Sequence, residues 1–213
     1  MTKYIVLDTE TTNSLDDPIV YDMGWAVVDE QGNVYETASY VIADVFCNKE
    51  LMSSAFFADK IPQYWEEIKN GSRILASFRT VRFKLAECCK NHNVKIIMAH
   101  NARFDYRSTN TTQRFLTNSK YRFFFPYGVE IWDTLKMARQ AFKDCEEYDT
   151  FCYENDYVTK RGCKRYNAEI IYRFISGDND FIESHTGLED VMIEKEIFAE
   201  CVRRGVNNGK LWE

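Results

Sequence analysis

The sequence lacks any apolar stretch approaching the roughly 18 to 20 residues that a membrane-spanning helix needs. Its first residues form a short apolar run that ends in an acid, without the longer apolar core and the cleavage site of a secretory signal peptide. From these two absences we expect a protein without membrane contact that works in the cytoplasm.

The sequence also lacks a C-x-x-C pair. Its seven cysteines are odd in number and scattered, apart from the adjacent Cys88 and Cys89, which suits a reducing compartment better than a disulfide framework. Cys145, Cys152 and Cys163 are close enough in sequence for a zinc site to be an alternative. The missing C-x-x-C pair makes that alternative the weaker one.

An excess of basic residues is absent as well. The chain has 27 basic and 33 acidic side chains, which gives a net charge of −6. Proteins that bind duplexes non-specifically by neutralising phosphates usually carry the opposite balance. Any contact with a nucleic acid must therefore be local or mediated by metal ions.

What is present points to one globular domain over residues 1–213. Hydrophobic residues make up 45% and aromatic residues 15% of the chain, which argues against disorder. Alternating or continuous apolar patterns predict strands at 3–8, on both sides of a turn at Gln31-Gly32-Asn33 within 22–42, at 94–99 and at 129–133. Helical spacing predicts a helix over 73–93, and the chain from Thr134 onward is mainly helical in pattern.

This order of elements predicts the α/β class, with a five-stranded mixed sheet flanked by helices on both faces. We expect the first strand at the centre of the sheet. Residues 144–162 are rich in acids and tyrosines and have no clear period, so we expect them to form a surface excursion.

Two acids one residue apart follow the first predicted strand. Asp8 and Glu10 share one side of an extended chain, and functional groups of open α/β sheets gather beyond the carboxyl ends of strands. Two buried carboxylates at this spacing must share a proton or hold a cation. The alternative is a solvated strand end followed by a turn.

A third carboxylate follows the strand at 94–99. If Asn101 caps the next helix, Asp105 lies in its first turn and leans back toward the strand ends. Complementing the helix dipole is the alternative use of this acid. His100 is expected to be an interior residue bonded to backbone, and His92 a solvated residue at a helix end.

The last two candidate residues lie at the predicted start of a helix near the C-terminus. Thr186 and Glu189 form a capping-box pattern, which predicts a helix from Gly187 to about Arg204. His185 then precedes the cap and Asp190 is the fourth helical residue, and these two positions normally hold a facing apolar pair. A histidine and an acid at these positions lose the contact that an apolar pair would make, which favours a functional role.

The candidate residues all lie at ends of predicted strands and helices, which a mixed sheet can bring to one edge. They are Asp8, Glu10, Asp105, Asp190 and His185. Such a cluster is untenable without divalent cations, and oxygen ligands select Mg²⁺ or Mn²⁺ over zinc. Two ions about 3.5 to 4 Å apart are the usual arrangement for attack of water on a phosphodiester.

In this order the motifs resemble those of the DEDDh branch of the DEDD exonuclease superfamily. They read Asp8-Thr9-Glu10-Thr11, then Asn-x-x-Phe-Asp at 101–105, then His-x-x-x-x-Asp at 185–190, and Thr186 stands where the sister branch has tyrosine. The resemblance spans residues 3–205, includes the segment WDTLKMAR, and is greatest to the epsilon proofreading subunits of bacterial DNA polymerase III and to epsilon-like phage exonucleases. It implies a ribonuclease H-like fold.

The resemblance also implies an activity, namely metal-dependent 3′-to-5′ hydrolysis of single-stranded DNA, RNA or short oligonucleotides to nucleoside 5′-monophosphates. Two ions, Mg²⁺ or Mn²⁺, would be held by Asp8, Glu10 and Asp190 directly and by Asp105 through water, with His185 as the base. Substrate contacts would come from Thr11 and Thr12, from Asn101 and from Phe104, which are otherwise helix caps or core. A DNA polymerase is the implied partner, in a bacterial or phage-infected cell.

Three features depart from the resemblance. Asn13 and Gly187 stand where many members of the superfamily have glycine and alanine, respectively, and residues 144–162 have no counterpart there that we can assign. Two other functions compete with the exonuclease. One is an inactive nucleic-acid-binding or polymerase-accessory module with the same fold, which the intact acids disfavour. The other is a small-molecule phosphohydrolase.

Overall fold

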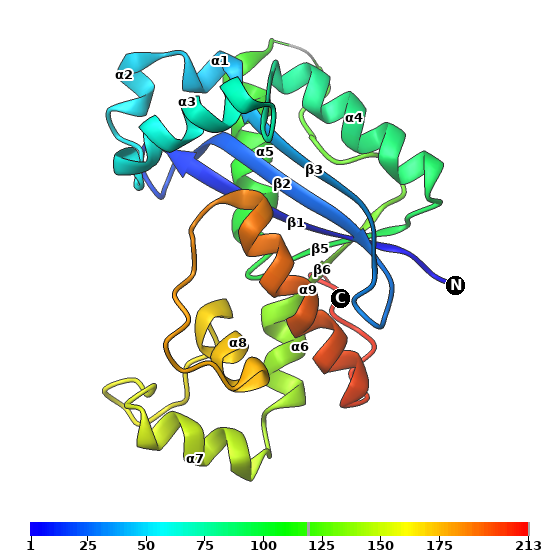
Figure 1. Ribbon diagram of the computed structural model, residues 1–213. Helices are drawn as coiled ribbons and strands as arrows, with labels where there is room; N and C mark the ends of the chain where they lie inside the picture. Colours follow the sequence, from blue (N-terminus) through cyan, green and yellow to red (C-terminus); the bar gives the residue numbers. More distant parts are fainter. Residues whose placement is uncertain (119, 213) are drawn as a thin grey trace.

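The computed structural model describes residues 1–118 and 120–212, which form one mixed sheet in the order β4-β3-β2-β1-β5-β6 (Figure 1). The antiparallel strands are β1 (Tyr4–Thr12), β2 (Ile19–Val28) and β3 (Val34–Ile42). The strands that pair in parallel with a neighbour are β4 (Ile74–Ala76), β5 (Ile96–Ala99) and β6 (Glu130–Asp133). β1 lies inside the sheet between β2 and β5, which confirms its predicted central place.

The predicted turn between β2 and β3 is confirmed. Gly32 has a φ of 81°, and the Asp29 carboxylate accepts the backbone N–H groups of Gln31 and Asn33 at 2.9 and 3.0 Å. A left-handed glycine at the tip lets the two strands fold back on each other.

The prediction of five strands is wrong, because the described residues form six. Ile74 and Leu75, which we assigned to the start of a helix, belong to β4, which pairs in parallel with β3 at the sheet edge. The helix begins only after Ser77, whose hydroxyl accepts the Thr80 N–H at 3.2 Å. The serine N-cap separates two elements that share one apolar pattern.

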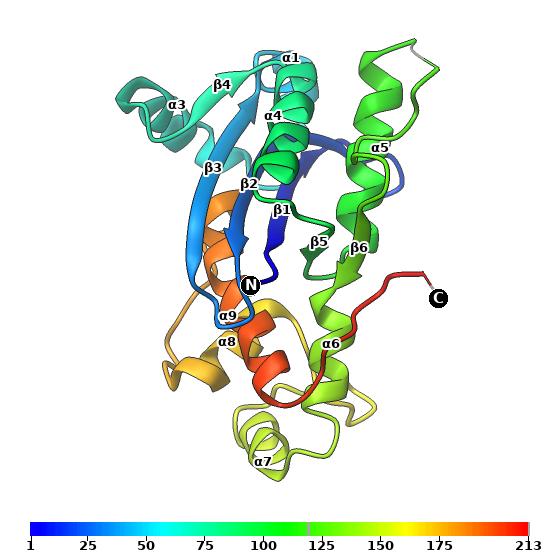
Figure 2. The ribbon, with the colours of Figure 1, turned by 90° about the vertical axis from the view of Figure 1, so that its right-hand side faces the viewer.

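Helices cover both faces of the sheet, as predicted (Figures 1 and 2). The core on the first face includes residues of α1 (Ala43–Phe46), α2 (Lys49–Met52), α3 (Ile61–Asn70), α4 (Phe78–Asn91) and α5 (Arg103–Leu116). The short 3₁₀ helix η1 (Ala58–Lys60) leads into α3. The second face packs against α6 (Thr134–Ala141), α7 (Glu146–Glu154), α8 (Ala168–Ser176) and α9 (Gly187–Arg203). Alternation divides β1 between them, with Ile5 and Leu7 in the first core and Tyr4 and Val6 in the second.

Residues 144–162, where we expected a surface excursion, contain regular structure. They include α7, whose Tyr148 and Cys152 are buried in the second core. The Tyr148 hydroxyl donates to the carbonyl of Arg165 at 2.6 Å. The apolar stripe of this helix is short and flanked by acids, which hid its period in the sequence.

The described part of the chain contains no helix with the length and apolarity needed to cross a bilayer.

Candidate active site

The two acids of β1 lie within the strand and not at its end. β2 continues to pair with β1 beyond Leu7, placing Asp8 opposite Gly24 and Glu10 opposite Asp22. The prediction that the strand ends at Asp8 is therefore wrong. Because Tyr4 and Val6 face the second core, Asp8 and Glu10 follow them on the side covered by α9.

Asp105 lies in the first turn of α5, as predicted, but Asn101 does not cap this helix. Ala102 is the N-cap residue, and Asn101 precedes it with a left-handed φ of 70°. The Thr9 hydroxyl donates to Asp105 Oδ1 at 2.8 Å. This bond fixes the α5 carboxylate beside β1.

α9 brings the last pair to the same place. Thr186 is its N-cap residue, and its hydroxyl donates to the Glu189 carboxylate at 2.6 Å instead of forming the backbone bond of a capping box. The facing of His185 and Asp190 is confirmed, since their ligand atoms and that of Glu10 all lie within 4.8 Å of one another. The structure thus gathers residues that are 180 positions apart in the sequence.

The carboxylates of this cluster repel one another. Burial raises the pKa of Asp8 well above its ordinary value, and the charges of Glu194, Asp105, Glu10 and Asp190 raise it further. Burial and the neighbouring Asp190 raise the pKa of Glu10 to about 9. Burial likewise raises the pKa of Asp105 to about 7 and that of Asp190 to about 6. Opposite charge placed among them would relieve this cost.

The donor set fits divalent cations of the hard type. Every carboxylate here offers oxygen, and none of the cysteines takes part in the group at Glu10, His185 and Asp190. Cys145, Cys152 and Cys163, the alternative zinc ligands of the sequence, form no such group within the described residues. The site therefore fits divalent cations held mainly by carboxylate oxygens.

Sequence reasoning missed two more acids at the site. Glu194 is buried on α9, four residues after Asp190, and accepts the His100 N–H at 3.2 Å. Burial, with Asp105, raises its pKa well above the ordinary value. The spacing of four residues on one helix face was the signal available for it. Burial and Asp190 raise the pKa of Glu183 to about 7, but Glu183 lies in an irregular segment that carries no signal.

The residues predicted to contact substrate lie in different environments. Thr12 is buried and its hydroxyl donates to the carbonyl of Leu51, so its side chain has a structural role. Thr11 and Phe104 are half-buried, and Asn101 is exposed. The backbone N–H of Asn101 donates to Asp133 Oδ1 at 3.0 Å.

The side chains of the other two histidines do not belong to the group at Glu10, His185 and Asp190. His100 bonds the Tyr166 carbonyl through Nε2 at 2.7 Å, which confirms the predicted backbone partner. His92 ends α4 as predicted, but it is half-buried and contacts Glu36, so the expectation of a merely solvated residue is wrong.

Both departures from the exonuclease motifs have local explanations. Asn13 has a φ of 70°, the left-handed conformation that glycine adopts freely and that asparagine tolerates better than most residues. A Cβ atom on Gly187 would lie 2.7 Å from the backbone N of Gly24. The close approach of α9 to β2 therefore requires glycine where relatives have alanine.

Comparison with solved structures finds this fold in DNA exonucleases. It is similar to that of Exonuclease I. The E. coli enzyme in complex with a dA16 oligonucleotide aligns with a TM-score of 0.59 and 11% identity, covering 96% of this chain and 41% of that one. Exonuclease I from Methylocaldum szegediense aligns with a TM-score of 0.59 and 16% identity, covering 95% of this chain and 40% of its own.

Exonuclease X, in complex with 5′ overhanging duplex DNA, is similar over most of both chains. Its TM-score is 0.53 at 14% identity, covering 94% of this chain and 91% of that one. No protein-family model and no curated protein matches the sequence. The comparison confirms the predicted exonuclease-type, ribonuclease H-like fold.

Proposed function

We propose that this protein is a metal-dependent 3′-to-5′ exonuclease that hydrolyses single-stranded DNA to nucleoside 5′-monophosphates. The observation that carries the proposal is that Glu10, His185 and Asp190 place their ligand atoms within 4.8 Å of one another, with Asp8 of β1 and Asp105 of α5 close enough to join the same cluster of negative charge. The fold similarity to Exonuclease I, which has been solved with a dA16 oligonucleotide, supports the same assignment.

Asp8, Glu10 and Asp190 would hold the metal ions directly, and Asp105 would hold the second ion through water. When bound, two divalent ions supply charge neutralisation of the phosphate and lower the pKa of attacking water. The acids contribute the negative charge that keeps the ions in place. This also explains how a protein with a net charge of −6 handles a polyanion.

His185 would act as the general base. Burial and the nearby Lys60 lower the pKa of His185 below its ordinary value, so the imidazole is neutral near pH 7 and can accept a proton. Its ring stacks on Phe57 with 4.5 Å between centroids and an interplanar angle of 9°. Stacking orients the nitrogen that takes the proton from the attacking water.

The backbone amides of Thr11 and Thr12 would contact the 3′-terminal nucleotide. Asn101 would contact its sugar or phosphate, and Phe104 would stack on a base. RNA or short oligonucleotides remain alternative substrates within this class. A DNA polymerase partner in proofreading, and the cytoplasm of a bacterial or phage-infected cell, also stay predictions.

The decisive experiment uses a single-stranded DNA and a matching RNA, each labelled at the 5′ end, with Mg²⁺, Mn²⁺ or EDTA. We expect a ladder that shortens from the 3′ end only with metal, and the faster ladder identifies the preferred polymer. Asp8→Asn should abolish the ladder, whereas Asp16→Asn, at an exposed acid in the next turn, should not.

Intact substrate under every metal condition, from protein shown to be folded, would favour the inactive accessory module instead. Competition by mononucleotide esters stronger than that by oligonucleotides would favour a small-molecule phosphohydrolase. Neither alternative predicts a metal-dependent ladder.

A further inference from the structure

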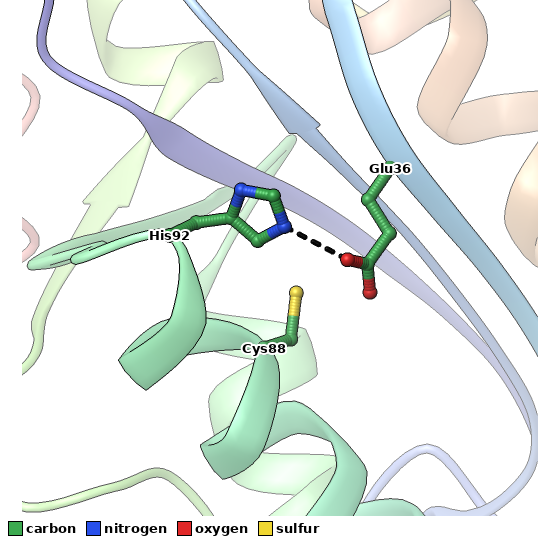
Figure 3. A group of neighbouring side chains, drawn as sticks. All are labelled: Glu36, Cys88 and His92. Carbon is green, nitrogen blue, oxygen red and sulfur yellow. Dashed lines mark hydrogen bonds and ion pairs between the residues drawn. The ribbon is translucent and has the colours of Figure 1, made fainter.

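A second group of metal-ligating side chains lies on the opposite face of the sheet from the carboxylates. Cys88 and His92 come from the C-terminal end of α4, and Glu36 comes from β3 (Figure 3). Glu36 shares a face of β3 with Tyr40, which packs in the first core with α4. The acids of β1 face the second core, so the two groups are separate.

The three ligand atoms are close enough to bind one ion. His92 Nε2 lies 2.8 Å from Glu36 Oε2, and the Cys88 sulfur points toward both, so that all three atoms lie within 4.8 Å of one another (Figure 3). Tetrahedral zinc takes nitrogen and oxygen at about 2.0 to 2.2 Å and sulfur at about 2.3 Å, which places its ligand atoms about 3 to 4 Å apart. Small side-chain rotations would bring the three residues to those distances.

Trp25 provides an independent indication. Its indole N–H is buried, donates to no nitrogen or oxygen atom within residues 1–118 and 120–212, and belongs to a side chain that lines the same cavity as Cys88. An N–H group beside the Cys88 sulfur is suited to stabilising the thiolate, which is the form of cysteine that binds a metal ion.

We propose that Cys88, His92 and Glu36 form a zinc site that links β3 to the end of α4. One thiolate, one imidazole and one carboxylate select Zn²⁺ over Mg²⁺. A cavity of about 380 Å³, lined by Trp25, Glu36 and Cys88 among others, adjoins the group. The proposed site does not depend on the exonuclease proposal.

Zinc binding would have to displace Lys3 from its contact with His92. Its Nζ lies 3.3 Å from His92 Nδ1 and 4.0 Å from the centre of the Tyr35 ring. A protonated lysine requires an unprotonated Nδ1, so the histidine proton is on Nε2 and donates to Glu36. Zinc at Nε2 moves that proton to Nδ1 and expels Lys3. Lys3→Met should therefore tighten zinc binding.

Titration of the full chain with Co²⁺ tests the site, because a cobalt–thiolate bond gives a near-ultraviolet charge-transfer band that carboxylates cannot give. We expect one equivalent of Co²⁺ to produce the band, and Zn²⁺ to displace it. Cys88→Ser should abolish the band, and His92→Gln should weaken Co²⁺ binding by about tenfold or more. Cys89→Ser, at the adjacent buried cysteine, is the matched control and should keep the band.

A wild-type titration without the band, or a band that persists in Cys88→Ser, would overturn the proposal. If Cys88→Ser fails to fold, His92→Gln and Glu36→Gln decide, because unchanged Co²⁺ affinity in both would overturn it as well. Melting curves in saturating Mg²⁺ give a second readout, in which Zn²⁺ should raise the Tm of the wild type but not that of His92→Gln.

Discussion

At the scale of single residues, His185 is held by its own backbone and by an aromatic ring. Its φ of 51° lies in the left-handed region, which residues other than glycine rarely adopt. Such a conformation persists only where the surrounding structure imposes it, and it is common at functional sites. The stacking on Phe57 and the position before the α9 N-cap supply that constraint here.

We expect His185→Ala to lower the rate of hydrolysis by roughly 10² to 10⁴ while leaving metal affinity nearly unchanged. The reason is that the variant loses the proton acceptor but keeps the acids. Single-turnover rates and Mn²⁺ titrations would measure the two effects separately. Partial rescue by added imidazole would confirm the chemical role, and full activity without it would remove His185 as the base.

Glu194 makes a second residue-scale prediction. In metal-free protein this buried acid adds to the repulsion around Asp8 and Asp105, so Glu194→Gln should raise the Tm in EDTA and reduce the further increase caused by Mg²⁺. Thermal melts with EDTA and with Mg²⁺ would show this. Glu196→Gln, on the same helix, pairs with Lys195 outside the cluster and is the control. Equal behaviour of the two variants would contradict the placement of Glu194.

At the scale of elements, the position of α9 depends on one close approach to β2. A Cβ atom on Gly24 would lie 2.3 Å from the backbone N of Leu188. The buried Asp22 carboxylate accepts the Gly187 N–H at 2.9 Å, the Tyr64 hydroxyl at 2.8 Å and the Arg73 guanidinium at 2.9 Å. One acid of β2 therefore joins α3, the start of β4 and the start of α9.

Gly187→Ala should destabilise the fold by about 1 to 3 kcal/mol, since the added methyl group has to push α9 away from β2. The same shift moves Asp190, so activity should fall more than stability alone explains. Denaturant unfolding and nuclease assays would measure both. Met192→Ala, at a partly exposed position of the same helix, should change neither by much, and a neutral Gly187→Ala would show that α9 has room to move.

At the scale of the whole molecule, folding concentrates negative charge that the unfolded chain keeps dispersed. The pKa values of Asp105 and Glu183, raised by burial to about 7, and that of Glu10, raised to about 9, lie above the unfolded values near 4. The folded protein therefore binds more protons than the unfolded chain in this interval. The stability that these three groups contribute is therefore present in full below about pH 4. It is lost as the pH rises through about 7 to 9.

We expect the Tm of the metal-free protein to fall between pH 6 and pH 9, and Mg²⁺ or Mn²⁺ to restore it most strongly at the higher pH. Deprotonated acids bind the cations, and bound cations stabilise the folded state. Melting curves at several pH values in EDTA and in Mg²⁺ would test this. A metal-free Tm that rises with pH over this range would contradict the clustering of the acids.

Much of the fold followed from local patterns. The hairpin turn at Gly32, the central β1 strand and the start of α9 were all predictable, because turn residues, apolar runs and caps act within a few positions of the chain. β4 was not, since a three-residue edge strand before a serine cap has the same apolar pattern as the first turn of a helix. Likewise, no local signal showed that the N-cap residue of α5 is Ala102 and not Asn101.

The sequence by itself was enough to predict which acids and which histidine belong together, because three spaced motifs in a fixed order resemble those of one superfamily. Only the tertiary structure decided their surroundings. Burial and proximity set the pKa values of Asp8 and Glu194, and the contact of β2 with α9 made Gly187 necessary. The approach of Cys88 to Glu36 also depends on how α4 packs on β3. Such effects act between residues that are remote in the chain, so no local pattern encodes them.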